Sequence, residues 1–508
     1  MTAYKLDPAD VLVVGAGIMG VGIAQVAAQA GHRVRLFDAR VGVAQHAAAQ
    51  LGATLDSLVA KGKLGAEAAE ATLARITPLG ALEEAGDVGL AIEAIVENLD
   101  AKRAVLQQLE ALLSSRCVLA TNTSSISVTA IANGLQHPGR LVGMHFFNPV
   151  PLMKLVEVVA GLHTEPGVAE AVFELARAWG KVPVHARSTP GFIVNRIARP
   201  FYAETLALLH EQAATPQVLD ACLRAVGFRM GPCELMDLIG HDTNFAVTNA
   251  VYEATFFDKR YVPSPVQREM VEGGLLGRKS GRGFYRYPPG TPPLPVAVHE
   301  APASAREVTV HGQGAVADVL EQAATRALAS QGWGPARAAG SDWTGLAIDQ
   351  ARLVMTDGRC AAEWAARFDL ADVAVFDRPF NLPAPSGSAL AFAVPPGAAS
   401  AWCGQAAAWL AALGFAPLRL ADAPGLVAAR TVAMLINEAA DAVQQGVCTP
   451  DAADAAMKLG VNYPAGPFEW LDRWSVAEVR AVLDALDAHY RGERYRVSPW
   501  LRHRSTHA

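Results

Sequence analysis

The stretch Ala9–Arg40, ADVLVVGAGIMGVGIAQVAAQAGHRVRLFDAR, decides the fold of the first part of this chain. Residues 11–14 form a short apolar run typical of a buried strand, and a glycine-rich turn follows at once. A helical pattern then runs from Met19 to Ala30, Gly31 ends it, and a second apolar run closes with Asp38. Strand, turn, helix, strand and acid in this order predict the opening unit of a dinucleotide-binding α/β domain.

The glycines of Gly15-x-Gly17-x-x-Gly20 each have a separate physical task. The first permits a tight turn, the second lets a pyrophosphate approach the backbone, and the third lets the helix pack on the strand. The free N–H groups at the start of the helix would then bind the phosphates. Ile18 and Met19 lie within this turn, so we count them among the predicted cofactor contacts.

Asp38 bears on the choice between the two nicotinamide cofactors. A carboxylate at the end of the second strand can accept hydrogen bonds from both hydroxyls of the adenosine ribose, and it would repel the 2′-phosphate of NADP. We therefore predict NAD as the cofactor. Arg40, close by in the sequence, is the one feature that argues against this choice.

A second informative stretch is LVGMHFFNPVPLMKLVEVV, residues 141–159. Its two apolar runs are typical of strands, and they flank Asn148–Pro151, where two prolines fix φ and remove backbone donors, so the chain must turn. If the strands fold back on each other, His145 and Glu157 lie roughly opposite one another. A carboxylate that holds one ring N–H leaves the other ring nitrogen free to take a proton, so the pair could act as a general base. A core histidine with an unrelated surface glutamate is the alternative.

Two further apolar runs end in polar residues. Glu97 closes the run GLAIEAIVE, and Asn122–Ser125 follow the run CVLAT. Ligands of open α/β sheets bind at the carboxyl ends of the strands, so we expect these side chains to lie near the cofactor. Turn formation and helix capping are the alternative roles for such small polar residues.

Composition and charge exclude several classes of function. The chain has 508 residues, 51% hydrophobic and 18% charged, which is typical of roughly three or four globular domains. A formal charge of −6 offers no basic surplus for nucleic acid, and no apolar stretch is long and uncharged enough to cross a membrane. The six cysteines form no CxxC pair, and no basic and apolar leader precedes the first strand. These features predict a reduced, cytoplasmic protein without a bound metal.

The sequence pattern changes several times along the chain, which predicts several domains. A proline-rich stretch separates two halves, and the second half shows Gly312-x-Gly314-x-x-Ala317 after EVTVH, without later polar strand ends like those of the first half. In order, we predict an α/β Rossmann-type NAD-binding domain (1–187), an all-α domain (188–287), a proline-rich linker (288–306), a degenerate Rossmann-like domain (307–420) and a second copy of the all-α domain (421–508).

The second all-α segment is predicted to be a copy of the first because two stretches repeat. APGLVAARTVAMLINEAADAV, from Ala423, matches TPGFIVNRIARPFYAETLALL, from Thr189, and AGPFEWLD matches MGPCELMD. Ala429 occupies the position of Asn195. The second copy therefore keeps the scaffold and lacks this polar side chain.

Five motifs in one order make the chain resemble the 3-hydroxyacyl-CoA dehydrogenase family. They are VVGAGIMGVGIAQVAAQAGHRV, AIVENLDAK, ATNTSS, HFFNPVPLMKLVEVV and TPGFIVNR, and the resemblance covers Asp10 to Tyr287. It implies NAD-dependent oxidation of a (3S)-3-hydroxyacyl-CoA to the 3-ketoacyl-CoA. The implied roles are catalytic base (His145), its partner (Glu157), substrate hydrogen-bonding residues (Ser124, Asn195), cofactor contacts (Asp38, Glu97, Lys102, Asn122) and a contact near the CoA moiety (Lys61).

The resemblance also bears on substrate and assembly. Long members with a doubled helical domain resemble 3-hydroxyadipyl-CoA dehydrogenases of aromatic-acid and phenylacetate breakdown, as well as 3-hydroxybutyryl-CoA enzymes of fatty-acid β-oxidation. A dicarboxylic chain would need a cation at its far end, for which Arg196, Arg199 and Arg229 are candidates. Single-copy members pair their helical domains across a homodimer, so the second copy could act as an internal partner and leave one site per chain.

Two other functions stay open at this point. One is an NAD-dependent dehydrogenase of a 3-hydroxy acid that carries no CoA. The other is a non-catalytic nucleotide-binding scaffold, against which the combination of His145, Glu157, Ser124 and Asn195 argues.

Overall fold

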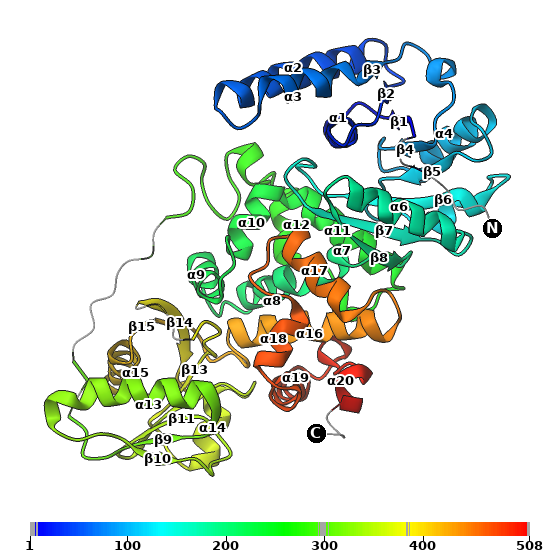
Figure 1. Cartoon of the computed structure of the whole chain (residues 1–508). Coiled ribbons are helices and arrows are strands. Elements are labelled where there is room, and N and C mark those ends of the chain that lie inside the picture. The colour runs from blue at the N-terminus through cyan, green and yellow to red at the C-terminus, as the bar shows by residue number, and fades with distance from the viewer. Residues whose placement is uncertain are drawn as a thin grey trace. The chain divides into compact units, whose positions relative to one another are not determined.

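The computed structural model of this chain describes residues 6, 9–292, 294, 301–302, 304–382, 385 and 387–504. The chain divides into two compact units, Met1–Arg196 with Ala442–Val461, and Ile197–Asp441 with Asn462–Ala508 (Figure 1). Most of the predicted proline-rich linker after residue 294 lies outside the described residues.

The first unit is built on an eight-stranded sheet with the order β3-β2-β1-β4-β5-β6-β7-β8. Neighbouring strands run parallel except β6 and β7, which run antiparallel. The predicted Rossmann-type sheet is thereby confirmed. The strands are β1 (Val11–Val14), β2 (Val34–Phe37), β3 (Ile76–Pro78), β4 (Leu90–Glu93), β5 (Val118–Thr121), β6 (Leu141–Phe146), β7 (Leu155–Ala160) and β8 (Val182–Arg187).

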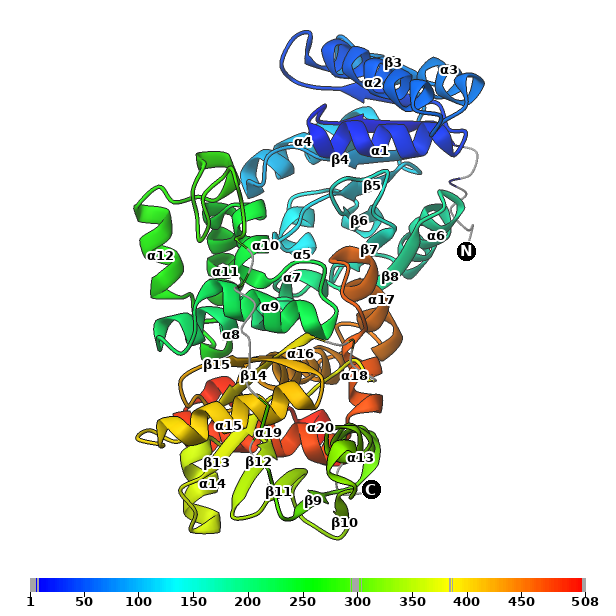
Figure 2. The same ribbon diagram turned by 90° about the vertical axis from the view of Figure 1, so that its left-hand side faces the viewer.

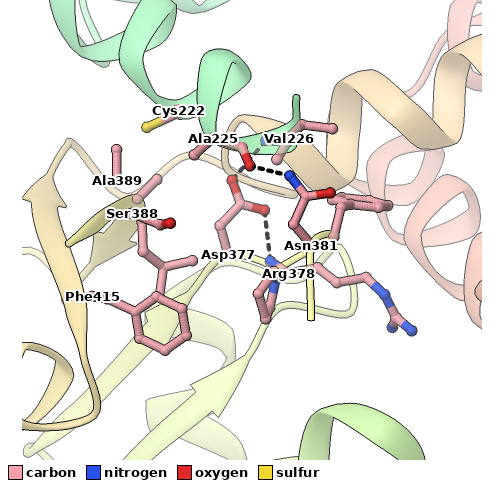
Figure 3. A pocket seen from close by; sticks show the side chains of 14 residues that line it. Cys222, Ala225, Val226, Asp377, Arg378, Asn381, Ser388, Ala389 and Phe415 are labelled. Atoms are coloured by element: carbon pink, nitrogen blue, oxygen red, sulfur yellow. Dashed lines mark hydrogen bonds between the residues drawn. The ribbon is translucent and has the colours of Figure 1, made fainter. Parts of the chain in front are cut away.

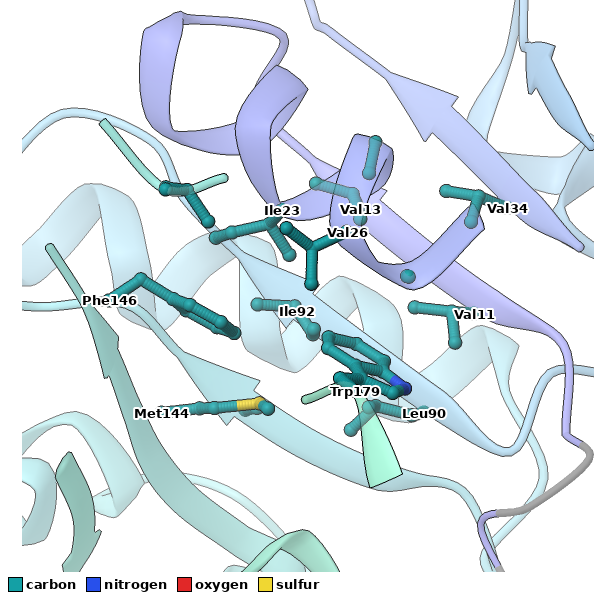
Figure 4. Close-up of a cluster of buried hydrophobic side chains, with 14 of the residues drawn as sticks. Val11, Val13, Ile23, Val26, Val34, Leu90, Ile92, Met144, Phe146 and Trp179 are labelled. Carbon is teal, nitrogen blue, oxygen red and sulfur yellow. The ribbon is translucent and has the colours of Figure 1, made fainter. Parts of the chain in front are cut away.

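Helices cover this sheet because its central strands are apolar on both faces. All four residues of β1 are buried, so each face needs a covering layer. In Figure 4, Ile23 and Val26 of the first helix face the side chains of the central strands. Figure 2 shows α2 and α3 side by side as a helical hairpin. The helices are α1 (Ile18–Gln29), α2 (Val43–Ala60), α3 (Ala66–Ala74), α4 (Leu99–Leu112), α5 (Val128–Ala132) and α6 (Pro166–Ala178).

The stretch 141–159 forms the predicted hairpin. Strands β6 and β7 pair with a register that sets His145 directly opposite Glu157. Lys181 holds the turn between them, because its ammonium donates to the carbonyl oxygens of Val150 and Met153. Burial lowers the pKa of Lys181 to about 8. The hairpin is therefore held at both its strands and its turn.

The second unit contains a seven-stranded mixed sheet with the order β10-β9-β11-β12-β13-β14-β15. Helices α13 and α15 contact each other and pack with the sheet around one apolar core. The elements are β9 (Val308–His311), α13 (Gly314–Leu328), β10 (Ala336–Ala338), β11 (Gly345–Ile348), β12 (Ala351–Met355), α14 (Ala361–Phe368), β13 (Val373–Phe376), β14 (Ser388–Ala393), α15 (Ser400–Ala412) and β15 (Phe415–Arg419).

Two sets of helices follow the two sheets in the sequence. The first set comprises α7 (Val194–Ile197), α8 (Arg199–His210), α9 (Pro216–Val226), α10 (Pro232–Ile239), α11 (His241–Ala254) and α12 (Pro265–Glu272). The second comprises α16 (Ala428–Gln444), α17 (Pro450–Gly460), α18 (Pro467–Arg473), α19 (Val476–Tyr490) and α20 (Pro499–Arg504). Helices α9 and α17 each begin with proline after a threonine cap, at equivalent places in the repeat.

The two helical copies contact each other through equivalent residues within the second unit. Glu204 of the first copy accepts hydrogen bonds from Arg494 at 2.9 Å and Tyr495 at 3.0 Å. Glu438, which aligns with Glu204, accepts from Arg260 at 3.3 Å and Tyr261 at 2.5 Å in the first copy. This reciprocal exchange is the pattern that a two-fold symmetric dimer shows between its subunits.

Candidate active site

The turn between β1 and α1 fits a dinucleotide. A Cβ placed on Gly17 would meet no heavy atom within 4 Å, so a pyrophosphate has room to approach the backbone there. A Cβ on Gly20 would lie 1.7 Å from the carbonyl oxygen of Gly15, so only glycine allows this packing of helix on turn. No side chain caps α1 and no acid stands in its first turn. The first N–H groups of α1 are therefore available to donate hydrogen bonds to a phosphate.

Asp38 lies beside this turn, as predicted. Its carboxylate accepts from the backbone N–H of Ala16 at 3.0 Å and of Arg40 at 3.0 Å. The Arg40 guanidinium adds bonds at 3.0 and 3.3 Å. Partial burial would raise the pKa of Asp38, but the hydrogen bonds from Arg40 and Ala16 lower it below its usual value. The carboxylate is therefore charged at neutral pH.

Glu97 organises the polar loop that follows β5. One of its oxygens, Oε1, accepts from the hydroxyl of Thr123 at 2.8 Å, from the N–H groups of Ser124 and Ser125, and from both of their hydroxyls. Burial would raise the pKa of Glu97, but the charge of Lys102 and these hydrogen bonds lower it to about 2. The loop is thus fixed around an ionised carboxylate.

Lys102 reaches Glu97 from inside the domain. Only 1% of its side chain is exposed, and its ammonium lies 2.8 Å from Glu93 and 3.3 Å from Glu97. Glu93 is fully buried and also accepts from the hydroxyl of Thr121 at 2.7 Å. In this structure Lys102 therefore holds carboxylates, and a direct contact with the cofactor stays a prediction. Sequence reasoning did not select Glu93, although a carboxylate at the end of the apolar run LAIE was a signal for it.

The histidine–glutamate pair forms as predicted. His145 Nδ1 lies 2.5 Å from Glu157 Oε2, and the other glutamate oxygen accepts from the N–H groups of Ile193 at 3.1 Å and Val194 at 3.0 Å. Glu157 is fully buried, so these donors fix its position. With Nδ1–H donated to the carboxylate, Nε2 is the nitrogen able to accept a proton.

Hydrogen bonds connect the pair to the polar loop. The amide of Asn195 donates to the carbonyl oxygen of Ser124 at 3.2 Å, and Asn195 follows Val194 directly. Asn122 accepts from the N–H of Phe146 at 2.8 Å, next to His145. The structure therefore brings His145, Glu157, Asn122, Ser124 and Asn195 into one connected set.

Lys61 is separate from this set. It caps the end of α2, its side chain is exposed, and no hydrogen bond or ion pair joins it to the site among the described residues. Of the three candidate cations, Arg196 donates to Gln445 at 2.8 Å, Arg199 is buried and donates to Thr248 at 3.0 Å, and Arg229 is exposed. Burial lowers the pKa of Arg199. The part of each arginine in substrate binding stays a prediction.

A segment of the second helical copy packs on the strand that carries Glu157. The carbonyl oxygen of Val447 accepts from the N–H of Arg187 at 3.0 Å. A Cβ on Gly460 would lie 2.6 Å from Leu155 on β7 and 3.1 Å from Val194. Helix α17 therefore contacts both β7 and the residue before Asn195, an arrangement that the repeat pattern alone did not reveal.

Across the described residues, no group of three or more His, Cys, Asp or Glu side chains is arranged to hold a metal ion. In the same part of the chain, no helix combines the length and apolar character needed to cross a membrane.

Three family models match the chain. The NAD-binding domain of 3-hydroxyacyl-CoA dehydrogenase matches residues 10–189, and the C-terminal domain of the same family matches twice, over 191–287 and 425–507. The reduced Rossmann-fold domain of 3-hydroxybutyryl-CoA dehydrogenase matches residues 353–424. The predicted fold class, with a degenerate α/β domain between two helical copies, is thereby confirmed.

Individual relatives agree with this assignment. The chain is 42% identical to 3-hydroxyadipyl-CoA dehydrogenase of Escherichia coli K12 over 97% of each chain. A crystal structure of 3-hydroxybutyryl-CoA dehydrogenase from E. coli K12 superposes with a TM-score of 0.86 at 39% identity, covering 100% of this chain and 99% of the other. A probable 3-hydroxybutyryl-CoA dehydrogenase of Deinococcus radiodurans is 42% identical over 54% of this chain and 99% of its own length.

Proposed function

Because this chain belongs to the 3-hydroxyacyl-CoA dehydrogenase family, we propose that His145 is the base of its NAD-dependent oxidation reaction and that a 3-hydroxyadipyl thioester is its preferred substrate. The observation that carries the first part is the 2.5 Å contact between His145 and a fully buried Glu157. The second part is supported by the 3-hydroxyadipyl-CoA dehydrogenase of E. coli K12, which matches 97% of this chain.

The reaction removes a proton and a hydride from one CH–OH group. Bound NAD would supply the hydride acceptor for carbon 3, and Gly15, Gly17, Gly20 and Asp38 are the residues that we propose to hold it. His145 Nε2 takes the hydroxyl proton as the C–O bond becomes a carbonyl. The 3-hydroxyacyl thioester thus becomes the 3-ketoacyl thioester, and the proton stays on the imidazole until it exchanges with water.

Glu157 stabilises the imidazolium that this transfer creates. Its carboxylate cannot swing away, because Ile193 and Val194 hold its second oxygen. In a site closed to water, a fixed opposite charge stabilises the developing positive charge more than solvent would. A positioned acid–base group of this kind contributes about 10²–10⁴-fold to the rate.

Ser124 and Asn195 are proposed to bind the substrate oxygens. The Asn195–Ser124 hydrogen bond sets their relative position, and Glu97 fixes the Ser124 hydroxyl at 3.2 Å. On substrate binding the Ser124 hydroxyl can turn from Glu97, which keeps the N–H donors of Ser124 and Ser125, and donate to a substrate oxygen. Lys61 on the α2–α3 hairpin is proposed to contact the CoA phosphates, since its exposed ammonium is suited to an anion.

A substrate panel tests this assignment. Steady-state kcat/KM with NAD would be measured for 3-hydroxyadipyl-CoA, 3-hydroxybutyryl-CoA, longer 3-hydroxyacyl-CoAs and free 3-hydroxy acids. We expect the adipyl thioester to give the highest value and free acids to give almost none, because the CoA moiety supplies much of the binding energy. A higher value for the butyryl thioester would overturn the choice of acyl chain, and comparable rates on free acids would overturn the CoA assignment.

A further inference from the structure

The second half of the chain contains a cavity that the proposed reaction does not use. It has a volume of about 790 Å³, and its walls come from three places within the second unit. These are the glycine turn at the start of α13, the loop between β13 and β14, and the corner between α18 and α19. Binding sites for small molecules measure about 300–1,000 Å³, so this cavity has room for a ligand of that class.

Arg473 brings to this cavity a positive charge that no described residue neutralises. Its side chain is exposed, and among the residues that the structure describes no ion pair or hydrogen bond engages it. The other arginine of the wall, Arg378, is bound to Glu478 at 2.8 Å and lies over the ring of Trp474 at 4.8 Å. These two arginines and one glutamate are the charged residues of the lining, so the wall carries one net positive charge.

The wall at the start of α13 also offers hydrogen-bond donors. Gln313 makes no side-chain bond to the N–H groups of this helix, and no acid stands in its first turn. A Cβ placed on Gly314 would meet no heavy atom within 4 Å, so a ligand has room to approach the backbone. The unpaired N–H groups of the first turn therefore add to the attraction of an anion by Arg473.

The remaining walls are apolar and rigid. Trp470 and Trp474 are buried, so each shows only part of its ring to the cavity. Phe380 packs edge-on against Trp474 with ring centroids 5.3 Å apart. A ligand that fills the cavity therefore needs an apolar or aromatic body as well as a negative charge.

The charge of the wall favours a phosphate over a carboxylate. The start of a helix adds about half a positive charge to the single net charge of the arginines and glutamate. A phosphomonoester carries about −1.5 to −2 at neutral pH, which matches this sum better than the single charge of a carboxylate. Three terminal oxygens can also use more of the available donors than two.

A dinucleotide is not the expected occupant. Strand β10 runs parallel to β9 as β2 runs parallel to β1, but Ala339 follows β10 where Asp38 follows β2. The carboxylate that would bind the hydroxyls of an adenosine ribose is therefore missing. Antiparallel β11 also lies beside β9, in the place that parallel β4 takes beside β1.

We propose that this cavity is a second ligand site, specific for a phosphomonoester with an apolar or aromatic body. The phosphate lies between the first turn of α13 and Arg473, and the body lies against Phe380, Trp470 and Trp474. The site binds without chemistry, because no histidine, cysteine or lysine lines it and Glu478 is held by Arg378. The inference does not depend on which acyl chain the first half oxidises.

A series of probes with one body and three head groups tests the proposal. Naphthyl phosphate, naphthoate and naphthol would be titrated calorimetrically into the full chain, with saturating NADH present to fill the glycine turn of the first half. We expect naphthyl phosphate to bind at one site per chain, naphthoate to bind more weakly and naphthol to bind least. Inorganic phosphate alone should bind more weakly than naphthyl phosphate, because it lacks the apolar body.

Four variants identify the charge that is responsible. Arg473→Ala should weaken naphthyl phosphate about tenfold or more, as for the loss of a charge-assisted hydrogen bond, and Arg473→Lys should weaken it less. Ala315→Asp should weaken it at least as much as Arg473→Ala, although an acid in the first turn favours the helix and so keeps the fold. Arg419→Ala is the matched control, because Arg419 is also exposed and without an ion pair among the described residues, but it does not line the cavity.

Fluorine NMR of protein labelled with fluorotryptophan places the probe. The resonances of Trp470 and Trp474 would be assigned from Trp470→Phe and Trp474→Phe. Naphthyl phosphate should shift these two resonances and leave that of Trp179, in the first unit, unchanged.

Each of four results would overturn the proposal. They are no binding of naphthyl phosphate at millimolar concentration, naphthoate binding as tight as that of the phosphate, equal losses in Arg473→Ala and Arg419→Ala, and unshifted resonances of both Trp470 and Trp474 at saturation. Failure of the dehydrogenase assignment would show in the substrate panel and would leave these titrations intact, so the two proposals fail separately.

Discussion

The hairpin of β6 and β7 has a counterpart in β13 and β14, and the two differ at the residues that we propose to carry the chemistry. In the first hairpin His145 pairs with Glu157. In the second, Asp377 follows β13 and donates its N–H to the carbonyl oxygen of Ala391 at 2.9 Å, so Asp377 stands in the place of the histidine. A carboxylate stands in the place of the imidazole, and the methyl group of Ala391 stands in the place of the Glu157 carboxylate.

The two carboxylates nevertheless perform the same structural task. Glu157 accepts from the N–H groups at the start of α7, and Asp377 accepts from Val427, Ala428 and Ala429 at the start of α16. Each negative charge satisfies amide donors that a helix start leaves unpaired. The anchoring of sheet to helix therefore survives without the histidine, and only the first copy combines that anchor with a proton acceptor.

Topology differs as well. The cavity beside Asp377 measures about 20 Å³, room for roughly one water, and Asn381 closes one side by donating to Ala225 at 2.8 Å (Figure 3). A cavity of about 790 Å³ lies beside the turn at Gly314. In the second sheet the antiparallel strand β11 lies between β9 and β12, where the first sheet has β4 parallel to β1. The crevice that parallel α/β sheets offer to a nucleotide is thus altered.

Replacing the proposed base should have the largest effect. His145→Gln should lower kcat by about 10²–10⁴-fold, because it removes the proton acceptor, and should retain NADH binding. Turnover with the best thioester and NADH titration of the same preparation would be compared. A kcat near that of the wild type would show that His145 is not the base.

The number of cofactor sites tests the comparison directly. We expect calorimetric titration with NADH to give close to one site per chain. Gly17→Leu should abolish binding, since its side chain would fill the space above the turn, whereas Gly314→Leu, the matched change in the second copy, should leave the titration unchanged. Two sites per chain, or a loss of binding in Gly314→Leu with the fold intact, would show that the second sheet also binds nucleotide.

Glu157→Gln should have a milder effect than His145→Gln. The amide oxygen can still accept from Ile193 and Val194, so the anchor remains, but the charge is lost and the amide N–H group then faces Nδ1 of His145. This favours the tautomer with the proton on Nε2, so we expect kcat to fall about tenfold or more. The acid limb of the pH–rate profile should move to lower pH, because the imidazolium loses its neutralising partner. An unchanged acid limb would mean that Glu157 serves only as an anchor.

Asp377→Asn should give the smallest effect, and one confined to stability. Burial raises the pKa of Asp377 to about 6 despite its hydrogen bonds from Ala428, Ala429 and Val427. A folded-state pKa above the unfolded value stabilises the fold at low pH, and this contribution is lost as the pH rises from about 4 to 6. Thermal unfolding at pH 4.5 and 7 should show that the variant lacks about 1–3 kcal/mol of this pH dependence. The exposed Asp372→Asn serves as control, and a pH dependence identical to the wild type in Asp377→Asn would contradict the expectation.

The sequence predicted the parts of the site that depend on local patterns. Two apolar runs separated by prolines indicated the hairpin, and the pairing of His145 with Glu157 followed from its geometry. The glycine turn and Asp38 could likewise be predicted from the sequence, because strand, turn, helix, strand and acid follow one another in the order that a dinucleotide-binding unit requires. Lys102 was assigned to the cofactor, and Glu93 was missed although its place at the end of an apolar run was a signal. The pairing of the two had no signal, because no local pattern marks a lysine that folds inward to a buried carboxylate.

Two features had no signal that a single sequence could give. The role of Asp377 depends on the register of the second sheet. The repeated stretches begin only at Thr189 and Ala423, so the repeat says nothing about the strands that precede them. The packing of α17 on β7 joins residues far apart in the chain, and the repeat shows that α17 resembles α9 without showing which sheet it contacts. Helix α9, for its part, contacts β14 of the second sheet.

The packing of α17 also sets an order for biosynthesis. The strand that carries Glu157 has been made by residue 160, but the helix that covers it is complete only at Gly460. A growing chain therefore exposes the apolar side of β7 while the ribosome adds about 300 further residues, roughly 15–60 s at typical elongation rates. During that interval the nascent first domain is open to chaperones and to neighbouring chains, and a messenger cut short before codon 461 yields a polypeptide in which α17 never covers β7.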